Sequence, residues 1–184
     1  MSRTANPSSP RPATAWGAAV GLLARRDLSE GEVRAKLLAR DFGEPEVEKV
    51  IARLRERRYL DDRSLAEAVA RIQARTKHQG PLKVRAHLRR RQIPEHLALE
   101  AIRLEFPEGA EGERAVIALK RLQPASSLDE RDADGALPPA ERRKESARLF
   151  RRLVARGYSW EAARHAVLAD GRPLEQERDT ELGT

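Results

Sequence analysis

Hydrophobic residues recur along this chain at the spacing of an amphipathic α-helix. Val33 and Leu37 are four residues apart, which places them on one helix face, and Val50 and Ile51 resume an apolar face after Gly43 interrupts the pattern. No segment alternates between apolar and polar residues over a useful length, so we predict no β-strands. The pattern therefore predicts an all-α fold built from helix–turn–helix pairs.

The same pattern occurs three times in the chain. With Phe42, Ile93 and Tyr158 in one column, matching residues stand at fixed distances before and after it in every copy. The matched sets are Val33, Val84 and Leu149; Leu37, Leu88 and Leu153; Arg40, Arg91 and Arg156; Val50, Ala101 and Ala166; and Ile51, Ile102 and Val167. Ile93 follows Phe42 by 51 residues and Tyr158 follows Ile93 by 65, and the second, longer interval contains a Pro-, Ser- and Asp-rich stretch. The chain is therefore predicted to contain an internal repeat.

A further helix is expected before each helix–turn–helix pair, at residues 15–26, 63–77 and 111–122. The middle one is expected to bury Leu65, Val69 and Ile72, which share one face. A unit of roughly 45 residues buries little core alone, so we predict three tandem three-helix repeats in an elongated, curved array. The predicted segments are a disordered tail at 1–14, repeats at 15–60, 61–107 and 108–170, an acidic loop at 123–139 within the third repeat, and an acidic disordered tail at 171–184.

Composition excludes several classes of protein. The chain has no cysteine, which excludes a disulfide framework, a zinc–thiolate site and a thiol nucleophile. It has no apolar run long enough to span a membrane, and its apolar N-terminal stretch leads into Arg25 and Arg26 without a signal-peptide cleavage pattern. We therefore expect a cytoplasmic protein with no membrane partner.

Catalytic and metal chemistry also lack a basis in the sequence. Asp61 and Asp62 have no His or Glu nearby at helical spacing, so we expect an aspartate here to cap the next helix. The histidines are scattered over different predicted helices: His78, His87, His96 and His165. We expect no catalytic residue, no metal site and no cofactor. Trp16 and Trp160 are expected to pack in the core rather than to stack on nucleic-acid bases.

The distribution of charge suggests a polyanionic partner. The chain carries a net charge of +7, and no acidic residue occurs between Ala68 and Pro94. That stretch contains the primary candidate residues: Arg71, Arg75, Lys77, Lys83, Arg85, Arg89, Arg90 and Arg91. A second basic face, interrupted by two glutamates, contains Arg142, Arg143, Lys144, Arg148, Arg151 and Arg152. These cations could contact DNA phosphates or an acidic protein groove, or form a solvated face of an arginine-rich protein.

Several segments in a fixed order carry a family resemblance. They are Leu22-Leu23-Ala24-Arg25-Arg26, Arg58-Tyr59-Leu60-Asp61-Asp62, Leu88-Arg89-Arg90-Arg91-Gln92-Ile93 and Leu153-Val154-Ala155-Arg156-Gly157-Tyr158-Ser159. With these segments the chain resembles the RecX family of recombinase regulators. The resemblance implies tandem three-helix repeats and a protein with no chemistry of its own. It also implies that the chain binds the RecA filament on single-stranded DNA and mainly inhibits its ATPase, strand-exchange and coprotease activities. Through these it would modulate recombinational DNA repair and the SOS response.

One alternative function remains open from the residues alone. Helix–turn–helix pairs with arginines on the second helix also occur in proteins that bind DNA directly. Such a protein normally has one unit and a dimer interface, whereas this chain has three units and no heptad seam, so we expect a monomer. Only Gln92 lies near a candidate recognition helix as a residue able to read adenine.

Overall fold

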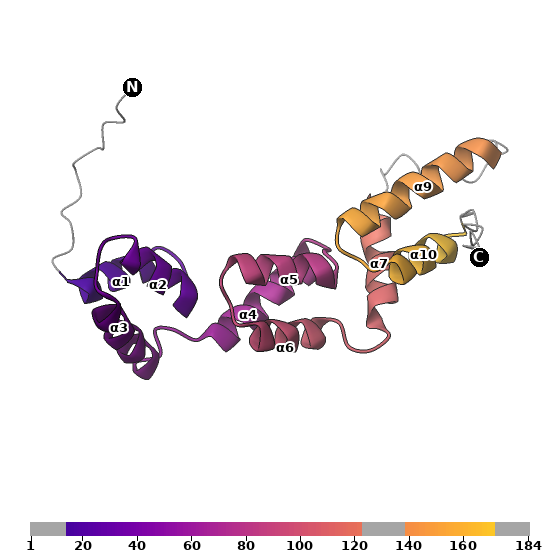
Figure 1. The fold of residues 1–184 in the computed structure, drawn as a ribbon. Coiled ribbons are helices and arrows are strands. Elements are labelled where there is room, and N and C mark those ends of the chain that lie inside the picture. The colour runs from indigo at the N-terminus through magenta and orange to yellow at the C-terminus, as the bar shows by residue number, and fades with distance from the viewer. Residues whose placement is uncertain (1–13, 123–138, 172–184) are drawn as a thin grey trace, which may run out of the picture. The chain divides into compact units, whose positions relative to one another are not determined.

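The computed structural model of the chain describes residues 14–122 and 139–171 (Figure 1). Every regular element in these two ranges is helical, so the predicted all-α fold is confirmed there. The elements are α1 (Ala15–Leu23), α2 (Glu30–Leu38), α3 (Glu44–Glu56), α4 (Asp62–Arg71), η1 (Ile72–Thr76), α5 (Pro81–Arg90), α6 (Glu95–Glu105), α7 (Ala110–Leu122), α9 (Pro139–Ala155) and α10 (Trp160–Ala169). Apart from their boundary residues, the expected tails and the expected loop 123–139 lie outside the described residues.

Three boundary residues belong with the adjoining helices. The Thr14 hydroxyl oxygen accepts a hydrogen bond from the Gly17 N–H at 3.1 Å and so caps α1. Pro139 opens α9, where the absence of an N–H has no cost because the first turn has no partner for it. Gly171 follows α10 with φ +71°, the left-handed conformation that commonly ends a helix.

The described residues form two compact units. Unit 1 contains residues 14–68 and 88–98, and unit 2 contains residues 69–87, 99–122 and 139–171. The division passes through α4, α5 and α6, so the residues of the predicted second repeat are shared between the units. The two units are therefore described separately below.

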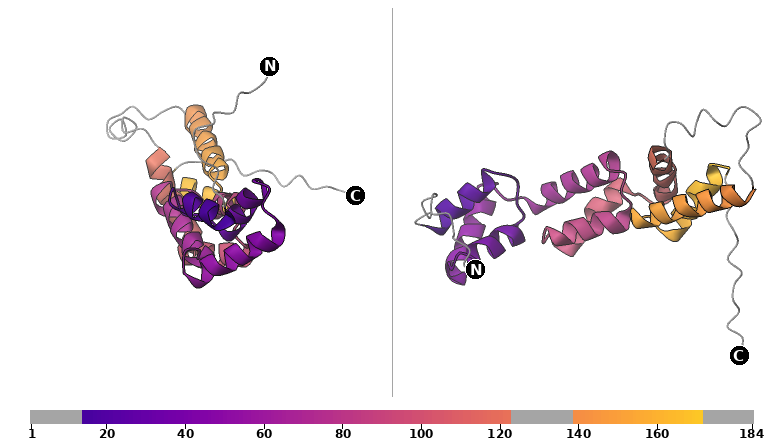
Figure 2. Two further views of the ribbon diagram at one scale, coloured as in Figure 1. Left: turned by 90° about the vertical axis from the view of Figure 1, so that its left-hand side faces the viewer. Right: turned by 90° about the horizontal axis from the view of Figure 1, so that it is seen from above.

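The core of unit 1 lies among α1, α2 and α3, which lie together in all the views (Figures 1 and 2). Val33 and Leu37, the two predicted face residues of α2, are fully buried there, and Phe42 packs partly buried against the same core. The buried face of α1 is formed by alanines, which allow close approach of the neighbouring helices. Each fully buried Val or Leu stabilises such a core by about 1.5–3 kcal/mol.

The core of unit 2 lies among α7, α9 and α10. Leu149, Leu153 and Tyr158, the predicted residues of the third copy, are all buried in it. The facing sides of α7 and α10 consist largely of alanine. Where the two helices meet, a Cβ atom on Gly112 would lie 3.0 Å from the His165 Nδ1 atom. Small residues therefore set the close packing of these two helices.

The predicted helix at 63–77 changes character at Ile72. There α4 gives way to η1, a π-helical segment whose wider turns rotate the following side chains. The predicted burial of Ile72 is wrong, because this residue is 50 % exposed, while Gln73 and Ala74 are buried instead. Val69, before the change, is buried as predicted.

Two successive helix–turn–helix corners meet the preceding repeat through a recurring contact, which we call the repeat joint. In unit 1 the Ser29 hydroxyl, at the start of α2, donates a hydrogen bond to the Arg91 carbonyl. The Arg91 guanidinium in turn donates to the Asp27 carbonyl at 2.6 Å. Both contacts tie the α5–α6 corner to the residues that lead into α2.

Unit 2 repeats this joint, with Gly80 in the place of Ser29 and Arg156 in the place of Arg91. The Gly80 N–H, just before α5, donates to the Arg156 carbonyl at 2.9 Å, and the Arg156 guanidinium donates to the Lys77 carbonyl at 2.8 Å. Gly80 is 51 residues after Ser29, and Arg156 is 65 residues after Arg91, which are the spacings of the sequence repeat. The repeated arginine thus links its own corner to the repeat before it.

Glycine is required at the unit 2 joint. Gly157 has φ +88°, and a Cβ atom there would lie 2.5 Å from the Lys83 backbone nitrogen. A Cβ atom on Gly80 would collide with the Gly157 carbonyl. The absence of both side chains lets the start of α5 pack directly on the α9–α10 corner.

Candidate polyanion-binding surface

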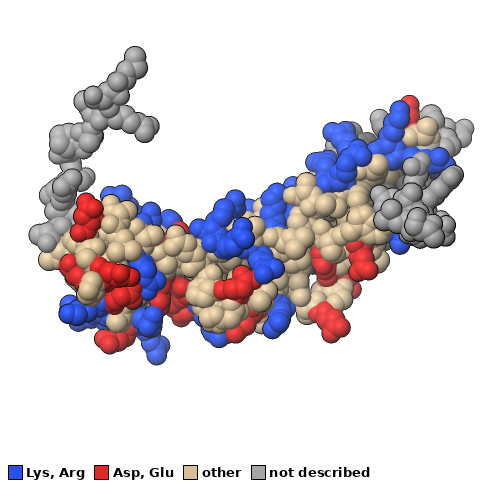
Figure 3. Space-filling model, viewed as in Figure 1, with Lys and Arg blue, Asp and Glu red and all other residues tan. Residues whose placement is uncertain are grey.

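The candidate surface centres on α5, which begins in unit 2 and ends in unit 1. Val84 and Leu88 are fully buried, which leaves the cations of α5 on the remaining sides of the helix. Those cations are Lys83, Arg85, Arg89 and Arg90, all exposed as predicted, and α5 contains no acidic residue. Figure 3 shows Lys and Arg side chains gathered over α5 on the face in view.

Lys83 also has a structural contact. Its ammonium donates a hydrogen bond to the Ala155 carbonyl at 2.8 Å, at the C-terminal end of α9. Unpaired carbonyls and the helix dipole make that end of a helix favourable for a cation. Lys83 therefore stabilises the unit 2 joint while its side chain remains exposed.

Arg91 does not face solvent with the four exposed cations of α5. Its side chain is only 16 % exposed, and its guanidinium forms an ion pair with Glu32 at 2.9 Å. Burial raises the pKa of the Glu32 carboxyl, but hydrogen bonds from Arg26, Arg91 and the Ser29 N–H outweigh this and hold the pKa below its usual value. The sequence did not indicate this role because Glu32 lies 59 residues away along the chain.

Two further candidates, Arg71 and Arg75, converge on one buried carboxylate. The Glu105 side chain, 6 % exposed, accepts from Arg75 at 2.8 Å and lies 3.9 Å from Arg71. Arg114 of α7 contributes a third guanidinium at 3.2 Å. Arg71 and Arg75 therefore share one side of the helix, as expected, and part of their charge neutralises Glu105. The remaining candidate of this run, Lys77, is exposed, and its carbonyl accepts from Arg156 at the joint.

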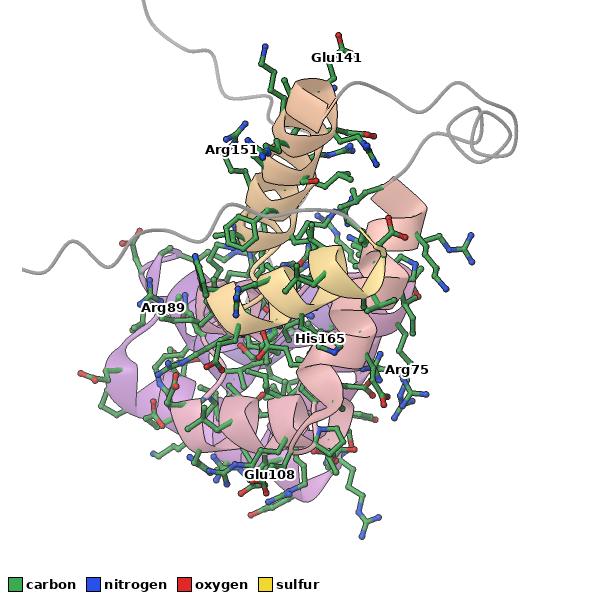
Figure 4. The ribbon with its side chains drawn as sticks, turned by 90° about the vertical axis from the view of Figure 1, so that its right-hand side faces the viewer. Arg75, Arg89, Glu108, Glu141, Arg151 and His165 are labelled. Carbon is green, nitrogen blue, oxygen red and sulfur yellow. The ribbon has the colours of Figure 1, made fainter. Side chains whose placement is uncertain are left out.

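The second basic face lies along α9 in unit 2. All six predicted cations of this helix are exposed, and with Glu141 and Glu145 they give α9 a net charge of +4. Figure 4 shows Arg151 projecting away from α9 and Glu141 at the far tip of the helix. Arg152 also donates to the Leu122 carbonyl at 3.1 Å, so it helps to hold α9 against α7.

An exposed aromatic side chain lies beside this basic helix. Trp160 is 51 % exposed at the first position of α10, so the expectation that it packs in the core is wrong. Its ring meets Phe150 of α9 edge-on, with the centroids 5.8 Å apart, and the Arg164 guanidinium lies 5.7 Å from the Trp160 ring centre. Trp16, in contrast, packs against the core of unit 1 as expected.

The two adjacent aspartates act as helix caps. Asp61 accepts hydrogen bonds from the Ser64 N–H and hydroxyl, which caps α4 as predicted. Asp62 instead accepts from the Glu30 N–H at 2.9 Å, at the start of α2. Within residues 14–122 and 139–171 no three His, Asp or Glu side chains are grouped in a way that could hold a metal ion.

None of the helices in the described ranges combines the length and apolar character needed to cross a membrane. The polar and charged surfaces of α5 and α9 illustrate why, because each helix exposes several cations on the side away from its core.

Comparisons with known proteins agree with this architecture. Models of the first and second three-helix domains of RecX match residues 15–54 and 61–102. The crystal structure of RecX from Lactobacillus salivarius has a similar fold, with a TM-score of 0.66 and 18 % identity, covering 85 % of this chain and 93 % of that one.

Relatives with higher sequence identity show the family. The regulatory protein RecX of Thermus thermophilus is 36 % identical over 140 residues, which are 76 % of this chain and 80 % of the relative. The regulatory protein RecX of Geobacillus kaustophilus is 34 % identical over 162 residues, and the match covers 85 % of this chain but about half, 54 %, of that relative. The identity, the two matched domains and the shared fold together place this chain in the RecX family of regulatory proteins.

Proposed function

We propose that this chain regulates the RecA recombinase by binding, as a monomer, the filament that RecA forms on single-stranded DNA. Its main effect is inhibition of the filament's ATP hydrolysis, strand exchange and coprotease activity, which would modulate recombinational DNA repair and the SOS response. Membership of the RecX family supports RecA as the partner. The basic helices support a polyanionic contact surface.

The observation that carries the proposal is the exposed side of α5. Four exposed cations lie there, and the helix carries no acidic side chain. Phosphates of DNA, or carboxylates along a groove of the filament, would both be attracted to such a helix. We therefore place the filament contact on α5, with α9 as a second basic face.

The experiment measures ATP hydrolysis by the cognate RecA on single-stranded DNA while this protein is titrated in. The wild-type chain should inhibit hydrolysis at or below equal stoichiometry. A variant with Arg85, Arg89 and Arg90 all replaced by Glu should inhibit at least tenfold more weakly, because it opposes the partner's charge at three exposed positions. Lys83 is left unchanged because it supports the unit 2 joint.

A matched control replaces three exposed cations of the first repeat, Lys36, Arg40 and Lys49, with Glu. It makes the same change in net charge and should retain inhibition. Loss of inhibition in the control alone would move the contact to the first repeat and contradict our placement on α5. No inhibition by the wild-type chain, together with tight binding to one duplex sequence, would replace filament regulation with direct DNA binding.

A further inference from the structure

Unit 2 exposes an apolar strip beside its basic helix α9. On α10, Trp160 and Leu168 are about half exposed, and Arg164 lies between them at helical spacing. On α9, Phe150 packs partly buried against the core and Val154, four residues later, is 43 % exposed. The strip thus combines an accessible indole ring with cations on both helices.

The Trp160 ring is held in place on two sides. Phe150 contacts it edge-on at an interplanar angle of 75°, and Arg164 lies over it. The Ser159 hydroxyl accepts from the Ala162 N–H at 3.2 Å and fixes the first turn of α10, from which the indole projects. An aromatic ring that is both fixed and half exposed loses little conformational entropy when a flat partner covers it.

The other tryptophan, Trp16, offers a poorer platform. In unit 1, Trp16 is partly buried, and the Arg53 and Arg57 guanidinium groups lie 4.4 and 5.6 Å from its ring centre. The neighbouring helix α3 carries four glutamates and three cations, so its net charge is −1, against +4 for α9. A polyanion would therefore approach Trp160 more readily than Trp16.

We propose that Trp160, positioned by Phe150 and Arg164, stacks on an unpaired base of single-stranded DNA while the cations of α9 contact the adjacent phosphates. The proposal extends the function proposed above, since it assumes that this chain contacts the DNA strand of its target. It specifies single-stranded DNA because the base faces of a duplex are covered by their neighbours. Arg151, exposed and next to Phe150 in sequence, supplies a phosphate contact near the stacked base.

The test separates bases from phosphates. In a Trp16→Phe background, Trp160 is the sole tryptophan, so its fluorescence reports directly on this site. Oligothymidylate of about 15 nucleotides, a typical site size for single-strand binding, should quench this fluorescence. An abasic oligonucleotide of equal length carries the same phosphates and should bind more weakly without comparable quenching.

Affinity measurements by fluorescence anisotropy of labelled oligonucleotides give the second readout. Trp160→Ala should weaken binding to oligothymidylate about tenfold, within the range for loss of one stacked base, and should leave binding to the abasic strand unchanged. Trp160→Phe, which keeps an aromatic ring, should recover most of the affinity. Tyr59→Ala removes an aromatic side chain that is 57 % exposed in unit 1 and serves as the matched control, with no expected effect.

Equal binding of oligothymidylate by Trp160→Ala and wild type would overturn the stacking site. A Trp160→Ala variant that loses affinity equally for oligothymidylate and for the abasic strand would also overturn it, because the effect would then not involve a base. The RecA ATPase assay distinguishes this failure from that of the proposed function. A wild-type chain that inhibits RecA while Trp160 makes no contribution to DNA binding refutes only the stacking site.

Discussion

Replacing Arg91 with alanine tests whether this arginine holds the fold together rather than contacting a partner. Arg89, two residues earlier, is exposed on α5 and provides the comparison. Arg91→Ala should lower stability and leave the proposed polyanion-binding surface in place. Arg89→Ala should do the reverse, with a stability change within about 0.5 kcal/mol and weaker binding to single-stranded DNA.

The size of the stability loss follows from the contacts of the Arg91 guanidinium. It donates to the Asp27 carbonyl at 2.6 Å and to one Glu32 carboxylate oxygen at 2.9 and 3.3 Å. Hydrogen bonds to charged groups contribute about 1.5–3 kcal/mol, and the three contacts of one side chain do not simply add. Glu32 retains its bond to Arg26 at 2.8 Å, so its charge is not left alone. We expect a loss of about 2 kcal/mol.

Thermal unfolding followed by Trp16 fluorescence is the assay, in a Trp160→Phe background so that the signal comes from unit 1. For a chain of this size, about 2 kcal/mol lowers Tm by roughly 4–8 °C. The contribution should also depend on pH. The folded pKa of Glu32 is lowered, so its pairing stabilises the protein above the unfolded value of 4.5 and is lost as pH falls through the lower folded pKa. The difference between wild type and Arg91→Ala should therefore shrink below about pH 4.5.

One pattern of results would refute this reasoning. Suppose that Arg91→Ala has the same Tm as the wild type at neutral pH and loses DNA binding as Arg89→Ala does. Arg91 then acts at the surface, and its contacts in the unit 1 joint contribute nothing to stability. A stability loss that stays constant down to pH 3 would contradict the role of the Glu32 ion pair, since protonation of that carboxyl would then make no difference.

Three other substitutions test the two joints and the core of unit 2. Gly157→Ala should destabilise unit 2 by several kcal/mol in urea denaturation, because φ +88° disfavours alanine and its Cβ would lie 2.5 Å from the Lys83 nitrogen. A free energy of unfolding unchanged within about 0.5 kcal/mol would contradict the close approach. Ser29→Ala removes the α2 cap and the bond to the Arg91 carbonyl, and should cost about 1–3 kcal/mol in the same assay. Burial raises the Tyr158 pKa to about 12, so the wild type should lose stability as pH rises from 10 to 12, and Tyr158→Phe should lose less over that interval in circular dichroism melts.

Local sequence patterns were sufficient to predict the helical fold and much of its core. The i and i+4 pairs Val33–Leu37 and Leu149–Leu153 are buried because a helical period alone decides which side of a regular helix meets its neighbours. The same argument failed at Ile72, where the π-helical segment η1 changes the number of residues per turn. A fixed period cannot predict the buried side of a helix whose geometry changes.

The candidate surface was predictable only in part, for a different reason. Arg89 and Arg91 are both arginines of one basic stretch, yet the Arg91 side chain is largely buried because the fold brings Glu32 and Asp27 next to it. Arg75 likewise pairs with Glu105, 30 residues further along the chain. Such pairings depend on how repeats dock, which no local sequence pattern encodes. The density of basic residues in the sequence therefore overestimated how many of these cations face solvent.

The repeat joint has a consequence for how such a chain can grow. The second copy carries both halves of the contact, a helix start that receives a corner and a corner that docks on the previous helix start. Tandem duplication of this unit of about 50 residues would therefore supply a matching pair without new side chains. The third copy departs from this rule. The residue equivalent to Gly80, 65 positions later, is Glu145, which lies inside α9 rather than at its start, because α9 begins at Pro139. The lengthened helix therefore removes the receiving half of the joint from the third copy, so a further repeat could not dock on α9 by the contact that joins the first three.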